Sequence, residues 1–120
     1  MHYVALILLV AVLALTLSCS SNILETLNGA CEDAMTKGDY PTAEKVCKQA
    51  VAEAETRAQN KPVHALALHD LAAFYSGQGQ YAQAEPLYKR ALAIQDQVLG
   101  PKHPNTVTTR KNLTDMLTKK

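Results

Sequence analysis

Apolar residues recur at helical spacing in the middle of the chain. They follow the i, i+3, i+4, i+7 pattern of one face of an amphipathic helix, at Leu68, Leu71, Ala72 and Tyr75. Gly77 and Gly79 then predict a turn, because glycine accepts the positive φ at which many helices end. A second helix is expected from about Tyr81, and Gly100 with the prolines around it predicts its end. The pattern therefore predicts a helical hairpin.

The same arrangement occurs twice in the chain. A shift of about 41 residues places Gly38 on Gly79, Tyr40 on Tyr81, Ala43 on Ala84, Cys47 on Tyr88 and Ala50 on Ala91. In an incomplete third copy, a shift of about 42 residues places Leu113 on Leu71, and Asn105 is expected to cap the helix. The predicted domain covers residues 22–120, with repeats over about 23–63 and 64–104 and a half repeat over 105–120.

Small residues recur where the two helices of a hairpin are expected to cross. Ala72, Ala84 and Ala91 let the backbones approach closely, and Tyr75 and Tyr88 fill the space beside them. We expect an all-α stack of antiparallel hairpins with about two and a half repeats and five helices. Because about three repeats are generally needed for stability, we expect marginal stability unless a disulfide, self-association or a bound partner contributes.

These residues resemble the tetratricopeptide repeat, and in particular the long repeats of kinesin light chains and many bacterial proteins. The typical run of that variety is similar to YAQAEPLYKRALAIQDQVLGPKHPNTVTTRKNL, and the resemblance extends from about residue 23 to 120. It implies a right-handed superhelical stack whose first helices line a concave groove for peptides or partner proteins. Cys31, Cys47 and Arg110 occupy positions at which the family usually has a small, an aromatic and an apolar residue.

The family geometry also implies a set of groove residues. They lie on the first helix of each unit and are Asn28, Glu32, His69, Asp70, Ala73, Lys111, Asn112 and Asp115. Asn112 matches a position where related repeats carry an asparagine that binds an extended peptide backbone. The basic cluster with which some relatives hold a C-terminal carboxylate is absent from these positions. We expect a groove of mixed polarity, and the alternative for each residue is a solvated helix face without a ligand.

Cys31 and Cys47 are equally distant from the turn expected near Asp39. Two antiparallel helices would therefore bring the cysteines side by side. A disulfide needs Cα atoms within about 7 Å, and oxidising surroundings would favour it. The alternative is two small buried thiols in alanine-like places.

The first 19 residues are expected to be a signal peptide or a membrane anchor. An apolar run extends from Val4 to Leu17, and no charged side chain precedes Glu25. The run is short for a spanning helix, which needs about 20 residues. Cys19, just after it, resembles the cysteine that is acylated in bacterial lipoproteins.

Three fates of this segment remain open: acylation at Cys19, an uncleaved membrane anchor, or ordinary cleavage near Ser18 or Ser20. The first two place the rest of the chain on the periplasmic or extracellular face of the cell envelope. The third makes the protein secreted.

Composition narrows the function classes further. A net charge of +1 gives no electrostatic footprint for nucleic acid or an anionic membrane surface. The histidines lack the i, i+4 spacing of a helical metal site, and the cysteines lack C-x-x-C spacing, so neither a metal nor a cofactor is expected; the histidines are His2, His64, His69 and His103. No nucleophile motif accompanies the carboxylates, so no enzyme is expected; those considered are Glu32, Asp33, Asp70 and Asp115.

Two functional hypotheses follow. The first is an envelope-tethered lipoprotein whose repeats bind a partner protein or peptide during assembly of a complex. The second is a structural subunit docked permanently in a larger membrane-associated complex, or a simple adaptor anchored by an uncleaved N-terminal helix. Met116 and Leu117 are the apolar residues of the last helix that we expect to be exposed for such docking.

Overall fold

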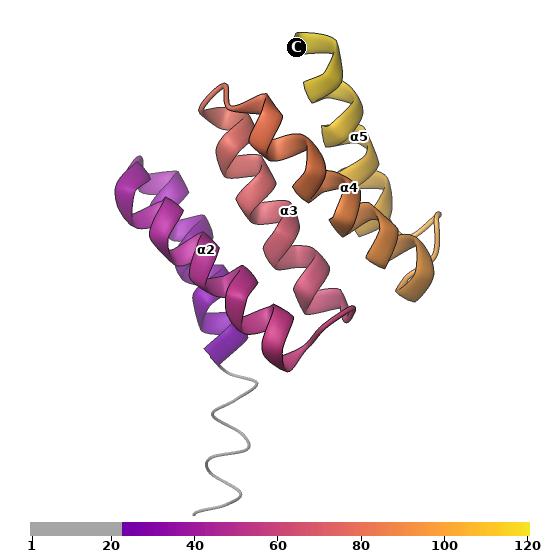
Figure 1. Cartoon of the computed structure of the whole chain (residues 1–120), viewed down its shortest axis with the longest axis horizontal. Coiled ribbons are helices and arrows are strands. Elements are labelled where there is room, and N and C mark those ends of the chain that lie inside the picture. Colours follow the sequence, from indigo (N-terminus) through magenta and orange to yellow (C-terminus); the bar gives the residue numbers. More distant parts are fainter. Residues whose placement is uncertain (1–22) are drawn as a thin grey trace, which may run out of the picture.

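The computed structural model describes residues 23–120, and this part of the chain is entirely helical (Figure 1). An N-terminal helix over residues 23–37 is followed by α2 (Tyr40–Arg57), α3 (Pro62–Gly77), α4 (Tyr81–Val98) and α5 (Pro104–Lys119). Five helices and no strand in the described residues confirm the all-α expectation. No helix among them is long and apolar enough to span a bilayer. The predictions for residues 1–19, including acylation at Cys19, lie outside the described range.

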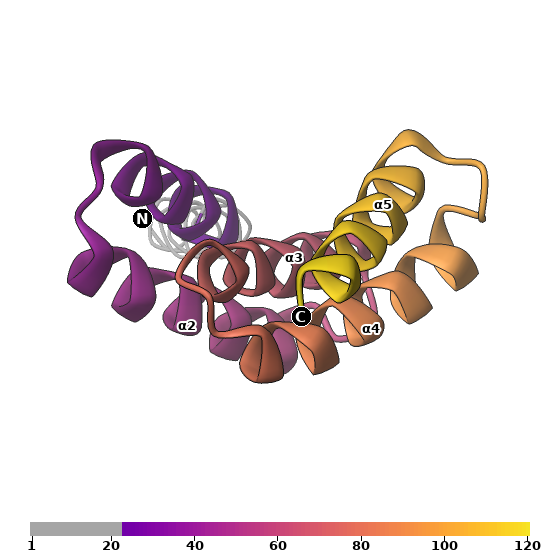
Figure 2. The ribbon, with the colours of Figure 1, turned by 90° about the horizontal axis from the view of Figure 1, so that it is seen from above.

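The helices form two curved layers. Figure 2 shows the N-terminal helix, α3 and α5 on the inner side of an arc, with α2 and α4 on the outer side. α3 packs against both α2 and α4, and α5 packs against α4 and touches α3. The first helix of each unit therefore lies on the inner side, as the resemblance implies.

The two hairpin turns are copies of each other. Gly38 and Gly79 both have a φ of 75°, a conformation that glycine adopts without a steric penalty. In each turn the next residue donates its backbone N–H to a carbonyl five residues earlier, Asp39 to Ala34 at 3.0 Å and Gln80 to Tyr75 at 2.8 Å. These bonds satisfy carbonyls left free at a helix end. The 41-residue repeat is thus present in the backbone.

The core is built from the small residues that the sequence singles out. Fully or almost fully buried alanines line the helix crossings: Ala43, Ala50, Ala72, Ala84 and Ala91. Tyr75 and Tyr88 are buried beside them. The predicted packing is confirmed, because alanine leaves the helices close enough for the two tyrosine rings to fill the remaining space.

The start of α5 differs from the expectation. Pro104 is its first residue, and His103 is the cap, with Nδ1 accepting the backbone N–H of Asn105 at 3.2 Å. The prediction that Asn105 caps this helix was wrong, since proline is favoured in the first position of a helix and the cap is the residue before it, His103.

The end of α5 also corrects an expectation. Leu117 is 42% exposed, but Met116 is only 2% exposed and belongs to the core. Arg110, at a usually apolar position, pairs with Asp96 at 2.8 Å and donates to the carbonyl of Pro101 at 3.2 Å. A charged residue fits there because no further helix packs on this side of α5 within the described part.

Candidate functional site

A small open pocket lies between α3, α4 and the start of α5. Its volume is about 60 Å³, and it is lined by Leu66, His69, Gln95, Asn105, Thr108 and Thr109. Leu66 is 39% exposed at its edge, whereas Gln95 is 3% exposed. Its Oε1 atom has no hydrogen-bond partner among residues 23–120. The pocket therefore combines an apolar edge with a residue whose buried acceptor is unpaired.

His69 is fixed between three helices. Its Nδ1 lies 2.9 Å from Thr109 Oγ1, and its Nε2 lies 3.4 Å from Asn112 Nδ2. Because the amide nitrogen can only donate, Nε2 accepts and Nδ1 carries the ring proton. The ring also packs edge-on against Tyr88, with centroids 5.5 Å apart. Burial lowers the pKa of His69, so the neutral form is favoured.

Asp70, the next residue on α3, is a buried carboxylate. It is only 6% exposed, and its Oδ2 atom has no hydrogen-bond partner in the described part of the chain. Burial and the nearby charge of Glu32 raise the pKa of Asp70 from 3.8 to about 7. Burial and Asp70 in turn raise the pKa of Tyr88. Asp70, one of the predicted groove residues, is therefore buried rather than open to solvent.

The other predicted groove residues differ in burial. Asn28 is buried, Ala73 and Asn112 are half-buried, and Glu32 is exposed. Lys111 and Asp115 are exposed and pair with each other at 2.7 Å. The structure joins His69 to Asn112, and the charge of Glu32 acts on Asp70. It does not bring Lys111 or Asp115 into the pocket.

The remaining pocket residues were not predicted from the sequence. Leu66 lies one turn before His69 and Asp70 on α3, so helical spacing alone indicates its position. Gln95 comes from α4, the second helix of its unit, which the family resemblance does not associate with the groove. Whether Gln95 contributes to the pocket depends on how closely α5 approaches α4.

The repeated hairpins, the glycine turns and the buried alanines can now be compared with known proteins. Residues 63–119 match the tetratricopeptide repeat family. The match covers almost all of α3 and all of α4 and α5, and it supports a tetratricopeptide repeat protein. Such repeats are generally protein–protein interaction modules without enzymatic activity. No curated protein sequence matches the chain at a significant level.

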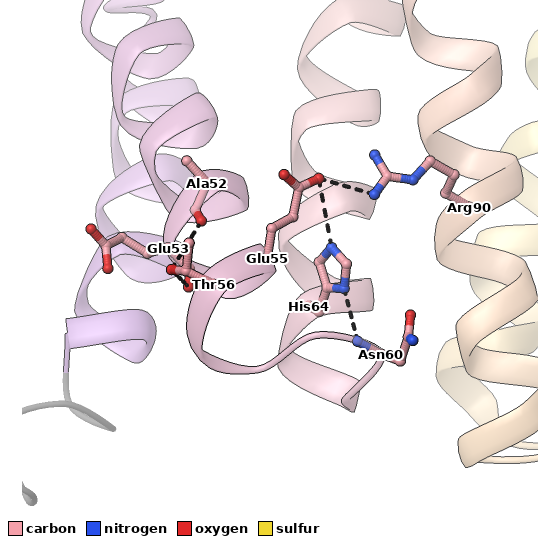
Figure 3. A network of polar contacts seen from close by, with 7 residues as sticks. All are labelled: Ala52, Glu53, Glu55, Thr56, Asn60, His64 and Arg90. Atoms are coloured by element: carbon pink, nitrogen blue, oxygen red, sulfur yellow. Dashed lines mark hydrogen bonds and ion pairs between the residues drawn. The ribbon is translucent and has the colours of Figure 1, made fainter.

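A polar network joins the two helical hairpins to each other (Figure 3). His64 is buried at the start of α3, and its Nδ1 accepts the backbone N–H of Asn60 at 3.1 Å. Its Nε2 lies 3.9 Å from Glu55 Oε1, which also accepts from Arg90 at 2.9 Å. Burial and the charge of Arg90 lower the pKa of His64 against the opposing effect of Glu55. The network stabilises the contact of α2, α3 and α4. Separately, no group of side chains in the described residues has the ligands for a metal ion.

The first helical hairpin carries a covalent link. Cys31 of the N-terminal helix and Cys47 of α2 form a disulfide, with Cα atoms 5.0 Å apart. Both residues are fully buried. In the 41-residue register they correspond to Ala72 and Tyr88 of the second hairpin. The first hairpin thus has a disulfide at the position where the second hairpin has an alanine and a tyrosine.

Proposed function

We propose that this chain is a non-enzymatic interaction module whose inner face binds a segment of a partner protein or peptide. The buried, unpartnered Oε1 of Gln95 in the pocket between α3 and α5 carries this proposal. A buried acceptor without a partner costs about 1–3 kcal/mol. A ligand that donates a hydrogen bond there regains this energy, so the pocket favours occupation.

The pocket also limits what it can bind. A volume of about 60 Å³ suits one small side chain rather than a whole small-molecule ligand. Leu66 offers apolar contact at the edge, and Thr108 and Thr109 offer hydroxyl groups. A short, extended segment that places a small side chain or a backbone N–H in the pocket fits this arrangement.

A photo-crosslinking residue in place of Leu66 tests the proposal in cells. The partner should form a discrete adduct with this variant. The matched control carries the same residue in place of Gln83, which is exposed on the outer helix α4. Adducts from position 83 but not from position 66 would contradict binding on the inner face.

The proposal places the module in the cell envelope, as a lipoprotein acylated at Cys19 that acts in the assembly of a complex. The apolar run before Cys19 supports export. The Cys31–Cys47 disulfide supports it independently, since such bonds persist mainly in oxidising compartments. The long-repeat variety of kinesin light chains remains the subfamily that the sequence favours.

The intact mass of the native protein tests the anchor. A chain that begins at Cys19 and carries a diacylglycerol or triacyl increment supports acylation. A chain that retains Met1 indicates an uncleaved anchor and a simple membrane-attached adaptor. A chain without lipid that begins after Ser18 or Ser20 indicates secretion.

One observation favours the second hypothesis, a structural subunit docked permanently in a larger complex. Val107 and Leu117 of α5 are apolar and exposed, at 48% and 42%. Under this hypothesis, Val107→Ser with Leu117→Ser would release the protein from its complex, whereas Gln95→Leu would not. The inner-face hypothesis predicts the reverse, so native gel electrophoresis of membrane extracts separates them.

A further inference from the structure

The acidic residues of the described region fall into three groups. Seven form ion pairs with lysine or arginine: Asp33, Glu44, Glu53, Glu55, Glu85, Asp96 and Asp115. Asp39 caps α2 by accepting the backbone N–H of Thr42. Glu25, Glu32 and Asp70 have no ion-pair partner among residues 23–120. These last three acidic residues are thus a minority, and they lie in the same part of the fold.

All three belong to first helices on the inner side of the arc. Glu25 and Glu32 are seven residues apart, which is about two helical turns, so they lie on one face of the N-terminal helix. In the 41-residue register they correspond to Leu66 and Ala73, and Leu66 lines the pocket of the next unit. The inner face is therefore acidic at its N-terminal part, and apolar and hydroxyl-rich toward α5.

Asp70 lies at the junction between the N-terminal helix and α3. The charge of Glu32 contributes to the raised pKa of its carboxyl group. The register places Asn28 and Asp70 at the positions that His69 and Asn112 occupy one unit later, where the side chains are 3.4 Å apart. Asn28 is buried like Asp70. The register and the effect of Glu32 on Asp70 thus link the three residues, which we call the acidic group.

This group is incomplete as it stands. Asp70 is more than nine-tenths buried, with 6% of its surface exposed, and its Oδ2 has no donor. A buried carboxylate needs hydrogen bonds and an opposite charge, since its desolvation is otherwise uncompensated. Exposed Glu32 adds negative charge that acts on Asp70. Both carboxylates would attract a cation that reaches this group.

We propose that Asp70, Glu32 and Asn28 form a subsite for a lysine or arginine side chain of the bound partner segment. The inference rests on the proposed function, because it assumes a segment on the inner face. An ammonium or guanidinium group donates to the free Oδ2 and neutralises the two carboxylates. The Asn28 amide supplies a further polar contact. The partner therefore has a basic residue beside the small residue that fills the pocket at Leu66.

Selection of peptides from a random phage-displayed library tests this subsite. The target is the full chain in detergent micelles, as the wild type and as Glu32→Gln with Asp70→Asn. The matched control is Asp33→Asn, which removes a charge from the residue next to Glu32, where Lys37 pairs with it. Amide replacements keep the shapes of the side chains, and circular dichroism checks that each variant is helical.

Enrichment of a lysine or arginine at one peptide position on the wild type and on Asp33→Asn, lost on the double variant, supports the subsite. For the best peptide, Kd should rise about tenfold or more on the double variant, as expected when a buried charge pair is broken. Peptides enriched on the wild type without a basic preference would overturn the subsite and leave the proposed function intact. Failure to enrich any peptide would overturn both.

Discussion

Helices α3 and α5 occupy the same place in consecutive units, but only α3 is buried on both sides. The shift of 42 residues pairs the buried residues of one face: His64 with Thr106, Ala67 with Thr109, Leu71 with Leu113, and Phe74 with Met116. The other face of α3 is buried too, through Ala65, Leu68, Ala72 and Tyr75. Its counterparts in α5 are half-buried or exposed: Val107, Arg110, Thr114 and Leu117.

The difference shows what a second helix contributes to a unit. Among the described helices, α3 is covered by α2 on one side and by α4 on the other, whereas α5 packs against the preceding unit alone. The face that would meet a following helix has accordingly gained an arginine and a threonine. The residue type at an equivalent position thus depends more on which helices pack against it than on its place in the repeat.

The largest contrast is expected at the pair Leu68 and Arg110. Leu68→Ala should lower the free energy of unfolding by about 2–5 kcal/mol, because it leaves a cavity between packed helices. Arg110→Ala should cost no more than about 1 kcal/mol, since its ion pair with Asp96 is exposed to solvent. Urea unfolding followed by circular dichroism measures both. Equal costs would contradict the one-sided packing of α5.

The N-terminal helix is the first helix of its unit, so it can be compared with α3 and α5. Cys31 corresponds to Ala72 in α3 and to Thr114 in α5, and it is held by a bond instead of by packing. Reduction should lower the free energy of unfolding by about 3 kcal/mol for a loop of this length. The measurement is urea unfolding with and without reductant.

A matched variant sharpens that prediction. Cys31→Ala with Cys47→Tyr gives the first hairpin the residues of the second, and its stability should not respond to reductant. Hydrogen exchange should place the loss on reduction in the N-terminal helix and α2. A loss spread evenly over all five helices would contradict a local role of the bond.

Asp70 and Asn112 form the third contrast, a buried carboxyl group against an amide at the equivalent position. The pKa of Asp70 is raised in the folded state to about 7 from 3.8. The folded protein therefore binds a proton that the unfolded chain has released, so stability from this group is present at low pH and lost as pH rises toward and through 7. Asp70→Asn removes this dependence and should stabilise the protein at pH 8 by about 1–3 kcal/mol.

Urea unfolding between pH 5 and pH 8 tests this expectation. The difference between wild type and Asp70→Asn isolates the carboxyl group, because His64 and His69 contribute equally to both. The free energy of unfolding of the variant should increase relative to that of the wild type as pH rises. A difference that is constant with pH would show that Asp70 has an ordinary pKa.

The smallest effect is expected for the network around His64, whose counterpart in α5 is Thr106. Glu55→Gln removes the charge that pairs with Arg90 and lies 3.9 Å from His64 Nε2. Because this pair is partly exposed, the expected cost is about 0.2–1 kcal/mol. The pKa of His64, followed by NMR, should fall further, since Glu55 is the group that opposes its lowering.

The hairpins could be predicted from the sequence because their signals are local or repeated. Gly38 and Gly79 indicate the turns, and Ala43 with Ala84 indicates the crossings. The burial of Met116 could also have been predicted, since the 42-residue shift places it on Phe74. Neither feature requires knowledge of how distant helices meet.

The candidate site depends on contacts between units, and little of it could be predicted. The register places Asp70 near the inner face, but its burial depends on the approach of the N-terminal helix and α4. Gln95 enters the pocket because α5 lies against α4. The His64 network joins three helices across a loop in which Asn60 has a φ of 60°. Such distances follow from packing and not from spacing along the chain.

A protein held at its N-terminus transmits mechanical load along its backbone. The disulfide between Cys31 and Cys47 carries that load directly from the N-terminal helix to α2. The turn at Gly38 is therefore not loaded. The bypassed loop covers 16 positions and withholds about 55 Å of extensible length until the bridge is reduced. Tension would thus spare this turn and reach α3 and the helices beyond it first.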